Sequence, residues 1–390
     1  MKMTQRIKNI PPYIFAEVDK KKQDALARGI DIIDLGIGDP DLPTPSFIVD
    51  SLTEAIKNPS THNYPPYQGT KDFRTAVATW YKRRFNVDLD PENEVVSLIG
   101  SKEGIAHMLL TCLDPGDIAI LPDPGYPVYK VATLIAGGIP YIVPLKEENN
   151  YEMDLSAIEP EVAKKANVLF VNYPNNPIGA VASDKHLQDV VDFGNKNNVL
   201  ICMDNAYSEV TYDGYKAKSI LEFKGAKDCC VEFHSLSKTF NMTGWRIGMA
   251  VGNKDGIQAL GKIKTNVDSG IFKAIQVAGI KALESNGSFI EGQNKIYQER
   301  RDVIVDGLNS LGWNLKKPKA SFYIWAKVPK GYTSADFVIQ LLETTGILVV
   351  PGTGYGPCGE GYFRISITTP VERLKEAVSR MKDKNIRFAA

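Results

Sequence analysis

The sequence is poor in cysteine and lacks the spacings that would give its thiols a structural or metal-binding role. Its five cysteines stand at positions 112, 202, 229, 230 and 358, without a CxxC pair, and Cys112 and Cys202 lie within apolar runs. An odd number of cysteines in such positions argues against a disulfide framework and against a zinc site. We therefore expect reduced thiols in a cytoplasmic protein without a bound metal.

Also absent are a surplus of charge and a long apolar segment. The 390 residues include 46 lysines and arginines and 46 aspartates and glutamates, so the formal net charge is zero. This balance gives no reason to expect nucleic acid or an anionic membrane as a partner. The sequence contains no run of about 18 apolar residues, the length that could span a membrane. In the basic N-terminal segment, Pro11 and Pro12 interrupt any apolar core of a signal peptide, so none is expected.

What the sequence does contain is a series of short apolar runs, each followed by a polar turn rich in glycine, proline or serine. The runs are EVVSLIG, DIAIL, NVLFV, NVLICM and CCVEF, and the turns are SKEG, PDPGYP, NYPNNPIG, DNAY and HSLSK. Runs that are apolar on both faces are typical of a mainly parallel sheet covered by helices. Helical patterns lie between them, for example in residues 183–197, so we predict an α/β fold.

Ligands of such sheets gather outside the carboxyl ends of the strands, so the five turns should converge on one site. Lys238 lies in the last turn, and Arg246 follows eight residues later. Taken alone, Lys238 could be an ordinary solvated lysine. A lysine just past an apolar strand and near a second cation also suits a Schiff base, which requires the neutral amine.

The neighbouring motifs offer groups that bind phosphate. Ser235 and Ser237 can donate to phosphate oxygens, and Arg246 can bind them through two N–H groups. The SKEG turn, which precedes an apolar helical stretch, offers backbone N–H groups at a helix N-terminus. A Schiff-base lysine beside a phosphate site indicates pyridoxal phosphate.

Asp204 suits the same cofactor. It ends the run NVLICMD, where a carboxylate without a partner would be costly, and a pyridinium nitrogen is such a partner. Tyr207 and Asn176 could reach the ring hydroxyl, and Tyr126 could stack on the ring. Each has an ordinary alternative when taken alone, as a helix cap, a turn residue or loop packing. Their occurrence together at successive strand ends favours the cofactor site.

Together these motifs resemble the class I/II aminotransferases of pyridoxal-phosphate fold type I. The resemblance covers nearly the whole chain and rests on GIGDPD, YPPYQGT, PDPGYPVY, NYPNNPIGA, DNAYSEV, SLSKTFNMTGWRIG and FRISI. GIGDPD is not a dinucleotide-binding fingerprint, because Asp41 occupies the position of its last glycine. The resemblance implies an α/β fold with a mainly parallel seven-stranded sheet in a large domain and a smaller α/β domain.

The resemblance also implies roles for individual residues. Lys238 would be the catalytic residue, which forms the Schiff base and moves a proton between substrate and cofactor, and Asp204 would bind the ring nitrogen. The other contacts to pyridoxal phosphate would come from Asn176, Tyr207, Tyr126, Ser235, Arg246, Ser101, Lys102 and, from the other subunit, Tyr64. The substrate would be bound by Gly38, Asn176 and Arg364.

For the SKEG turn and for Arg364, the sequence itself adds to what the resemblance implies. The SKEG turn departs from the Gly/Thr-rich turn of aspartate aminotransferases, so the side chain that touches phosphate there stays open. Arg364 shares a strand face with Tyr362 and Ser366, opposite an apolar face. Such an arginine is either exposed or partly buried beside an anion, and the resemblance favours the buried state.

The implied architecture has a large cofactor domain over residues 46–285 and a small domain over residues 286–390. Residues 1–45 would form an N-terminal arm and part of the small domain. The family implies a homodimer with active sites at the interface. The reaction would be a ping-pong exchange of an amino group between an amino acid and a 2-oxo acid.

Two other functions remain open. A pyridoxal-phosphate lyase that eliminates a β-substituent, such as a C–S lyase, would use the same residues. A transcription regulator with an aminotransferase-like domain would need a fused helix-turn-helix region. Only about 45 residues precede the expected large domain, and the charge is balanced, which argues against the regulator.

The substrate is read from the region after Arg246. Aspartate-type relatives often place a second arginine there, but residues 262–279 contain lysines and Asp268 and no arginine. The segments RIKNIPPYIFAEVDKKK and TNVDSGIFKAIQ are similar to LL-diaminopimelate aminotransferases, which implies exchange between LL-diaminopimelate and 2-oxoglutarate in lysine biosynthesis. Alanine, aspartate or aromatic amino acids are the alternative donors. Asp268 and Ser269 would place an acidic group near the site or cap a helix over residues 271–285.

Overall fold

The computed structural model describes residues 2–10 and 14–388, with the side chains of residues 14–19 excepted. Pro11 and Pro12, which carry the argument against a signal peptide, lie outside these residues. Among the described helices, none combines the length and the apolar character needed to cross a membrane.

A seven-stranded sheet with the order β2-β8-β7-β6-β5-β3-β4 forms the centre of the molecule. β8 runs antiparallel to both of its neighbours, whereas the pairs from β7 to β4 are parallel, as the apolar runs predicted. The strands are β2 Val95–Leu98, β3 Ile118–Asp123, β4 Ile139–Pro144, β5 Ala166–Asn172, β6 Leu200–Asp204, β7 Cys230–Ser235 and β8 Gly248–Gly252.

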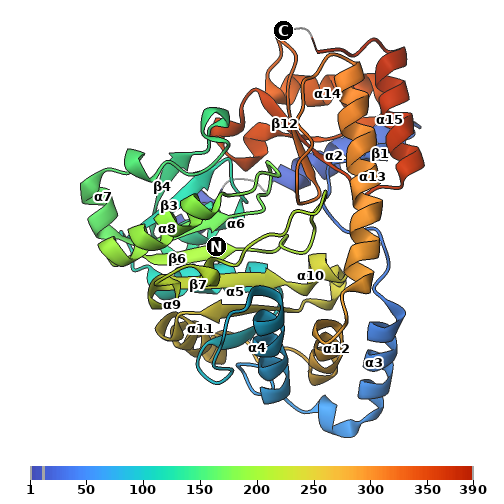
Figure 1. Cartoon of the computed structure of the whole chain (residues 1–390). Helices are drawn as coiled ribbons and strands as arrows, with labels where there is room; N and C mark the ends of the chain where they lie inside the picture. Colours follow the sequence, from blue (N-terminus) through green and yellow to red (C-terminus); the bar gives the residue numbers. More distant parts are fainter. Residues whose placement is uncertain (1, 11–13, 389–390) are drawn as a thin grey trace.

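Helices surround this sheet and extend beyond it (Figure 1). The long helix α13 runs along one side of the molecule, from the level of α10 and α12 up to α15. The helices are α1 Gln5–Asn9, α2 Ile14–Ala27, α3 Ser46–Lys57, α4 Lys71–Phe85, α5 Ser101–Cys112, α6 Val128–Ala136, α7 Pro160–Lys165, α8 Asp184–Asn197, α9 Ala226–Cys229, α10 Leu236–Thr239, α11 Lys254–Val267, α12 Lys273–Leu283, α13 Ser288–Ser310, α14 Ser334–Thr345 and α15 Val371–Asp383.

The helix predicted over residues 183–197 is α8. Ser183 caps its N-terminus, because the Ser183 side chain accepts a hydrogen bond from the backbone N–H of His186 at 3.2 Å. The apolar side chains of α8 at Leu187, Val190 and Val191 are buried, whereas the opposite face is solvated.

The strands of the sheet bury side chains on both faces. Val95 of β2 belongs to one hydrophobic cluster, and its neighbour Val96 belongs to another. Successive side chains of a strand point to opposite faces, so both faces of the sheet are covered by helices. This explains why the strands read as continuous apolar runs rather than as an alternating pattern.

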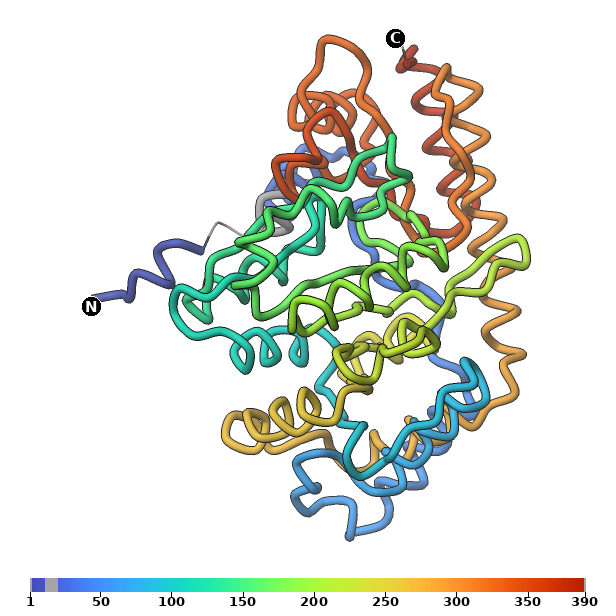
Figure 2. The backbone as a smooth tube through the Cα atoms, turned by 60° about the vertical axis from the view of Figure 1, so that its left-hand side comes forward, coloured from blue at the N-terminus to red at the C-terminus, as the bar shows by residue number. Residues whose placement is uncertain are grey.

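Two smaller sheets form the other part of the molecule. β9 Tyr323–Lys327, β12 Tyr362–Ser366 and β11 Val350–Pro351 are antiparallel, and β1 Ile33–Asp34 pairs in parallel with β10 Ile347–Leu348. The N-terminal segment therefore returns to lie among segments from the C-terminal third of the chain (Figure 2).

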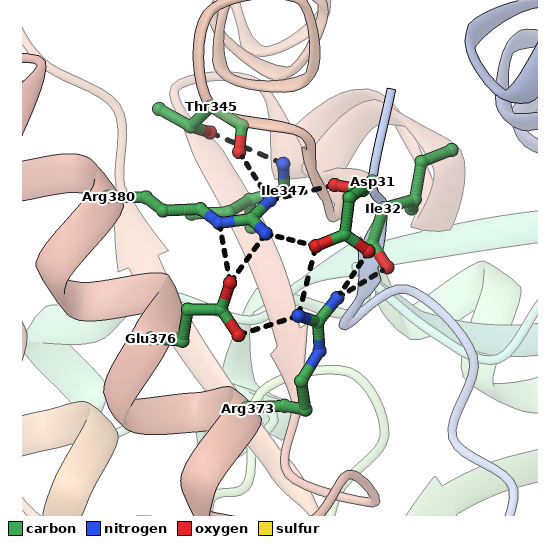
Figure 3. A network of polar contacts seen from close by, with 7 residues as sticks. All are labelled: Asp31, Ile32, Thr345, Ile347, Arg373, Glu376 and Arg380. Carbon is green, nitrogen blue, oxygen red and sulfur yellow. Dashed lines mark hydrogen bonds and ion pairs between the residues drawn. The ribbon is translucent and has the colours of Figure 1, made fainter. Parts of the chain in front are cut away.

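Ion pairs hold the N-terminal segment against α15 (Figure 3). Asp31 accepts hydrogen bonds from Arg373 at 2.9 and 3.0 Å and also contacts Arg380. Glu376, which lies in α15 between these two arginines, forms ion pairs with both of them. The Arg373 and Arg380 side chains hold the pKa of the Asp31 carboxyl below its ordinary value. This network fixes the chain just before β1, and β1 leads directly to Gly36 and Gly38.

Candidate active site

A cavity of about 310 Å³ lies at the carboxyl ends of β5, β6 and β7. The turns that follow these strands converge there, as the sequence predicted. The cavity is lined by Ile37, Gly38, Ser101, Tyr126, Asn176, Asp204, Ala206, Tyr207, Ser235, Lys238, Tyr323 and Arg364.

Lys238 enters the cavity from the single-turn helix α10. Ser235, the last residue of β7, caps this helix by accepting a hydrogen bond from the backbone N–H of Ser237 at 3.3 Å. The Lys238 Nζ donates to the carbonyl oxygen of Gly38 at 3.0 Å. Burial lowers the pKa of Lys238 to about 8, and the charges of Arg364 and Arg246 act in the same direction. The neutral, nucleophilic form of the amine is therefore far more populated near neutral pH than in an ordinary lysine.

Asp204 ends β6 inside the protein. Its Oδ2 accepts a hydrogen bond from the Tyr129 hydroxyl at 2.7 Å. Its Oδ1 is buried and has no hydrogen-bond partner among the described residues. Burial raises the pKa of Asp204 to about 6, although the Tyr129 hydroxyl and the Ala206 backbone act to lower it. A buried acceptor without a partner is costly and is placed to receive an N–H donor in the cavity.

The N-terminus of α5 forms the opposite end of the site. Gly100 precedes the helix with a φ of 76°, a conformation that favours glycine. A Cβ at Gly100 would lie 2.2 Å from Nη2 of Arg246, so the guanidinium packs directly against this turn. Arg246 also donates to the carbonyl oxygens of Thr243 at 2.9 Å and Ile99 at 3.4 Å. The helix N-terminus, Ser101, Ser235 and Arg246 together suit an anion such as phosphate.

Arg364 is buried, with 1% of its surface exposed, as the resemblance favoured. Its guanidinium donates to Asn176 Oδ1 at 2.9 Å and to the Gly36 carbonyl at 2.5 Å. The guanidinium carbon lies over the rings of Tyr323 and Tyr355, at 4.1 and 4.8 Å from the ring centroids. These contacts hold the cation at the edge of the cavity, where it can bind a carboxylate.

The segment that contains Gly38 is fixed at both ends. Arg364 binds the Gly36 carbonyl, and Asp41 accepts hydrogen bonds from the buried Arg300 at 2.6 and 2.8 Å. A Cβ at Gly38 would lie 2.1 Å from the Tyr323 hydroxyl, so only glycine allows this approach. Asp41 in the GIGDPD motif therefore has a structural partner.

Three predicted features lie away from the cavity. Lys102 is exposed and does not line it, whereas Ser101 does, so Ser101 is the side chain of the SKEG turn that reaches the site. Tyr64 is 83% exposed and does not line the cavity of its own chain. Of the two alternatives for Asp268 and Ser269, the cap of a helix over residues 271–285 is wrong, because α12 begins at Lys273 and Phe272 occupies the cap position.

Asp268 instead ends α11 and takes part in a charged cluster. Its Oδ2 lies 2.9 Å from the Nζ of Lys264, and its Oδ1 accepts from the backbone N–H of Gly270 at 2.8 Å. Lys264 also donates to Glu103 Oε1 at 3.0 Å, and Glu103 Oε2 accepts from the Ile99 N–H at 2.8 Å. This cluster joins α11 to the turn that forms the anion-binding end of the cavity. Because the carboxylate of Asp268 is already paired, it is not a free acidic group.

The groups around the cavity fit a phosphorylated pyridine. The unpartnered Asp204 Oδ1 suits a ring N–H, and the α5 N-terminus with Arg246 suits a phosphate. Lys238 lies between them with an amine of lowered pKa. Pyridoxal phosphate has these three parts, and the residues present match it.

Comparisons with known proteins agree with this geometry. A family model described as aminotransferase class I and II matches residues 30–381. The chain belongs to the class I and II aminotransferases. The proteins of this family depend on pyridoxal phosphate, and so does this aminotransferase.

Its relatives match along nearly their full length. An LL-diaminopimelate aminotransferase of Halothermothrix orenii is 54% identical over 388 residues, with 100% of each chain covered. The enzyme of the same name from Maridesulfovibrio salexigens is 55% identical over 381 residues, which covers 97% of this chain and 98% of the relative. Among solved structures, substrate-bound BacF from Bacillus subtilis is 40% identical, with a TM-score of 0.95 and 100% of both chains covered.

The sequence reasoning missed several residues of this aminotransferase site. Tyr129 lies three residues after Tyr126 in the motif PDPGYPVY, at the start of α6. Its closeness to the predicted cofactor contact Tyr126 is the signal that could have identified it. Tyr323 left a weaker signal, as a tyrosine in the apolar run SFYIWAK that would need a hydrogen-bond partner once buried. Lys264 looked like an ordinary lysine of an amphipathic helix.

Proposed function

We propose that this aminotransferase exchanges an amino group between LL-diaminopimelate and 2-oxoglutarate, as a step of lysine biosynthesis. The observation that carries the reaction type is the convergence of Lys238, Asp204 and Arg364 on one cavity. The substrate follows from the full-length relatives, which are named LL-diaminopimelate aminotransferases and are more than 50% identical.

The residues of the chain divide the work between them. Arg364 binds the carboxylate on the reacting carbon of the substrate, because its guanidinium is buried and faces the cavity. Asp204 would stabilise a positive charge on the ring of a bound cofactor through Oδ1, which is buried and has no partner among the described residues. Pyridoxal phosphate, when bound, supplies the electron sink that makes the Cα–H bond of the substrate acidic.

Lys238 transfers the proton in this scheme. Its amine, with a pKa lowered to about 8, would accept the Cα proton of the substrate in the neutral form and, once protonated, would act as the acid that gives the proton back. The Gly38 carbonyl, 3.0 Å from Nζ, orients the amine while it is free.

The distal end of the substrate carries a second carboxylate and an ammonium. Residues 262–279 contain no arginine that could serve as the second carboxylate ligand of an aspartate enzyme. Asp268 is paired with Lys264, so we do not assign it to the distal ammonium. The distal groups must therefore be recognised by other residues.

A panel of amino donors with 2-oxoglutarate as the acceptor tests the assignment. We expect kcat/KM for LL-diaminopimelate to exceed that for aspartate, alanine and aromatic amino acids by about a hundredfold, which corresponds to a few kcal/mol of specific distal contacts. A preference for one of the other donors would remove the lysine-pathway assignment but leave the aminotransferase in place. A C–S lyase would instead release a thiol and fail to convert glutamate in a single half-reaction.

We also propose a cytoplasmic homodimer with small-molecule substrates, without a nucleic-acid or membrane partner. The exposure of Tyr64 supports the dimer, because a tyrosine that is 83% exposed on this chain is available to complete the cavity of a partner subunit. The unpaired state of all five cysteines supports a reducing compartment. Sedimentation velocity on the purified protein measures the oligomeric state.

The division into domains belongs to the same proposal. We assign residues 46–285 to a large domain and residues 286–390, with part of residues 1–45, to a small one. One hydrophobic cluster supports it, because it joins Ile33 and Leu35 to α13, α14 and α15. The same cluster includes Ala206 and Tyr207 of the large domain, which marks where the two parts pack together. Residues 1, 11–13 and 389–390 of these ranges lie outside the described part of the chain.

A further inference from the structure

We propose that Tyr323 is a positioning residue that joins the substrate-binding Arg364 to Tyr207 beside the cofactor ring. The proposal rests on the proposed function, because it takes Arg364 as the carboxylate ligand and Tyr207 as a cofactor contact. Tyr323 begins β9, is 3% exposed and lines the cavity. Its ring and its hydroxyl contact different parts of the site.

The ring of Tyr323 supports the guanidinium of Arg364. The guanidinium carbon lies 4.1 Å from the ring centroid, which is within the range of a cation–π contact. Tyr355 lies 4.8 Å from the same carbon. At a buried site such contacts are stronger than in water, so the ring of Tyr323 restricts where Arg364 presents its N–H groups.

The hydroxyl of Tyr323 contacts the cofactor side of the cavity. It lies 3.0 Å from the Tyr207 hydroxyl, and the two rings meet edge to face at 5.5 Å. A phenol has one O–H donor. If Tyr207 donates to the ring oxygen of the cofactor, Tyr323 must donate to Tyr207. A chain of this kind polarises its members, so the Tyr323 hydroxyl strengthens the hydrogen bond that Tyr207 gives.

Gly38 makes this arrangement possible. Its missing side chain leaves the space that the Tyr323 hydroxyl occupies, and its carbonyl accepts the hydrogen bond of Lys238 Nζ. One tyrosine therefore touches the carboxylate ligand, the cofactor contact and the backbone that orients the catalytic amine. None of the signals used in the sequence reasoning pointed to it.

Because the ring and the hydroxyl act on different ligands, two substitutions separate them. Tyr323→Phe removes the hydroxyl and keeps the ring over Arg364, whereas Tyr323→Leu removes both. Tyr212→Phe is the matched control, since the buried Tyr212 hydroxyl donates to the Ser321 carbonyl at 2.7 Å and Tyr212 does not line the cavity. Two dissociation constants are measured: that of glutarate, an unreactive dicarboxylate, for the holoenzyme, and that of pyridoxal phosphate for the apoenzyme.

We expect Tyr323→Phe to bind glutarate within twofold of the wild type and pyridoxal phosphate about three- to tenfold more weakly, the scale of one buried hydrogen bond. Tyr323→Leu should raise the dissociation constant of glutarate by about fivefold or more, the scale of a buried cation–π contact. Tyr212→Phe should change neither constant. The Phe variant keeps the packing and decides the proposal if the Leu variant does not fold.

The proposal would be overturned if Tyr323→Phe lost affinity for glutarate and pyridoxal phosphate equally. It would also be overturned if this variant kept both dissociation constants of the wild type. A Leu variant that folds and binds glutarate like the wild type would overturn it too. If the wild-type protein itself failed to bind pyridoxal phosphate, the proposed function would fail first, and the two failures are therefore distinguishable.

Discussion

The hydroxyl of Tyr129 donates to Oδ2 of Asp204 at 2.7 Å, while the other carboxylate oxygen is buried and finds no partner in the part of the chain that the structure describes. Tyr129 is itself fully buried and belongs to α6, so the bond fixes the carboxylate at the end of β6. The apoprotein therefore keeps a carboxylate in a place that disfavours its charge. This arrangement costs stability until a cation occupies the cavity.

Replacing Asp204 with Asn should make stability less dependent on pH. The folded pKa of Asp204 is about 6, above its ordinary value of 3.8, so the folded state binds the proton more tightly than the unfolded state. Apoprotein stability therefore falls as the pH rises from about 4 to about 6, by ~3 kcal/mol for a shift of about two units. Unfolding of both apoproteins at pH 4.5 and pH 7.5 measures this effect. The Asp204→Asn variant should become more stable relative to the wild type as the pH rises. The same difference in unfolding free energy at both pH values would contradict the account.

Gly100→Ala should weaken binding of pyridoxal phosphate by at least about tenfold. The new methyl group would meet the Arg246 guanidinium, and the backbone, with φ 76° and ψ 151°, lies in a region almost restricted to glycine, where alanine is strained by ~1–3 kcal/mol. Gly116→Ala is the control, because its φ is 98° and its Cβ would meet nothing within 4 Å. Fluorescence titration of the apoproteins should separate the two. Equal affinities would show that Arg246 does not need this close approach.

Lys264→Met should destabilise the protein by ~3–5 kcal/mol, because it removes the buried cation between two carboxylates and leaves only the His107 imidazole beside them. The Lys264 side chain is 0% exposed and lies 3.0 Å from Glu103 and 2.9 Å from Asp268. Lys262→Met, on the exposed side of the same helix, is the control and should change stability by less than about 0.5 kcal/mol. Urea unfolding of the two variants measures the difference. A Lys264 variant as stable as the control would mean that the cluster contributes little.

Much of the sheet could be predicted from the sequence, because strands that bury both faces have to be apolar throughout. The runs around Val95, Ile120, Leu169, Ile201 and Val231 lie in β2, β3, β5, β6 and β7. β8 was not predicted, since GMAVG is short and rich in glycine. The pairing of β1 with β10 joins residues more than 300 positions apart, and no local pattern encodes such a contact.

The residues that follow the strands and line the cavity were predicted better than the side chains that hold them in place. Residues such as Lys238 and Asp204 lie directly after apolar strands, so their position in space follows from the topology. Tyr129, Tyr323 and Lys264 act through side chains that meet only after folding. Of the two roles that the sequence left open for Asp268, the helix cap is wrong, because α12 begins five residues later and the carboxylate binds Lys264. Both contacts of Asp268 are local, since Lys264 precedes it by four residues and Gly270 follows it by two, and they place Asp268 at the end of α11 rather than at the start of α12.

The most direct test of the account is the attachment point of the cofactor. The wild-type protein is loaded with pyridoxal phosphate, reduced with borohydride, digested and mapped by mass spectrometry, with Lys238→Ala treated in parallel. We expect the label on Lys238 alone, because its amine lies in the cavity with a pKa of about 8. Lys238→Ala should bind the cofactor through Asp204 and Arg246, carry no label and lose transamination. A label on any other lysine, or an active Lys238→Ala variant, would contradict the account.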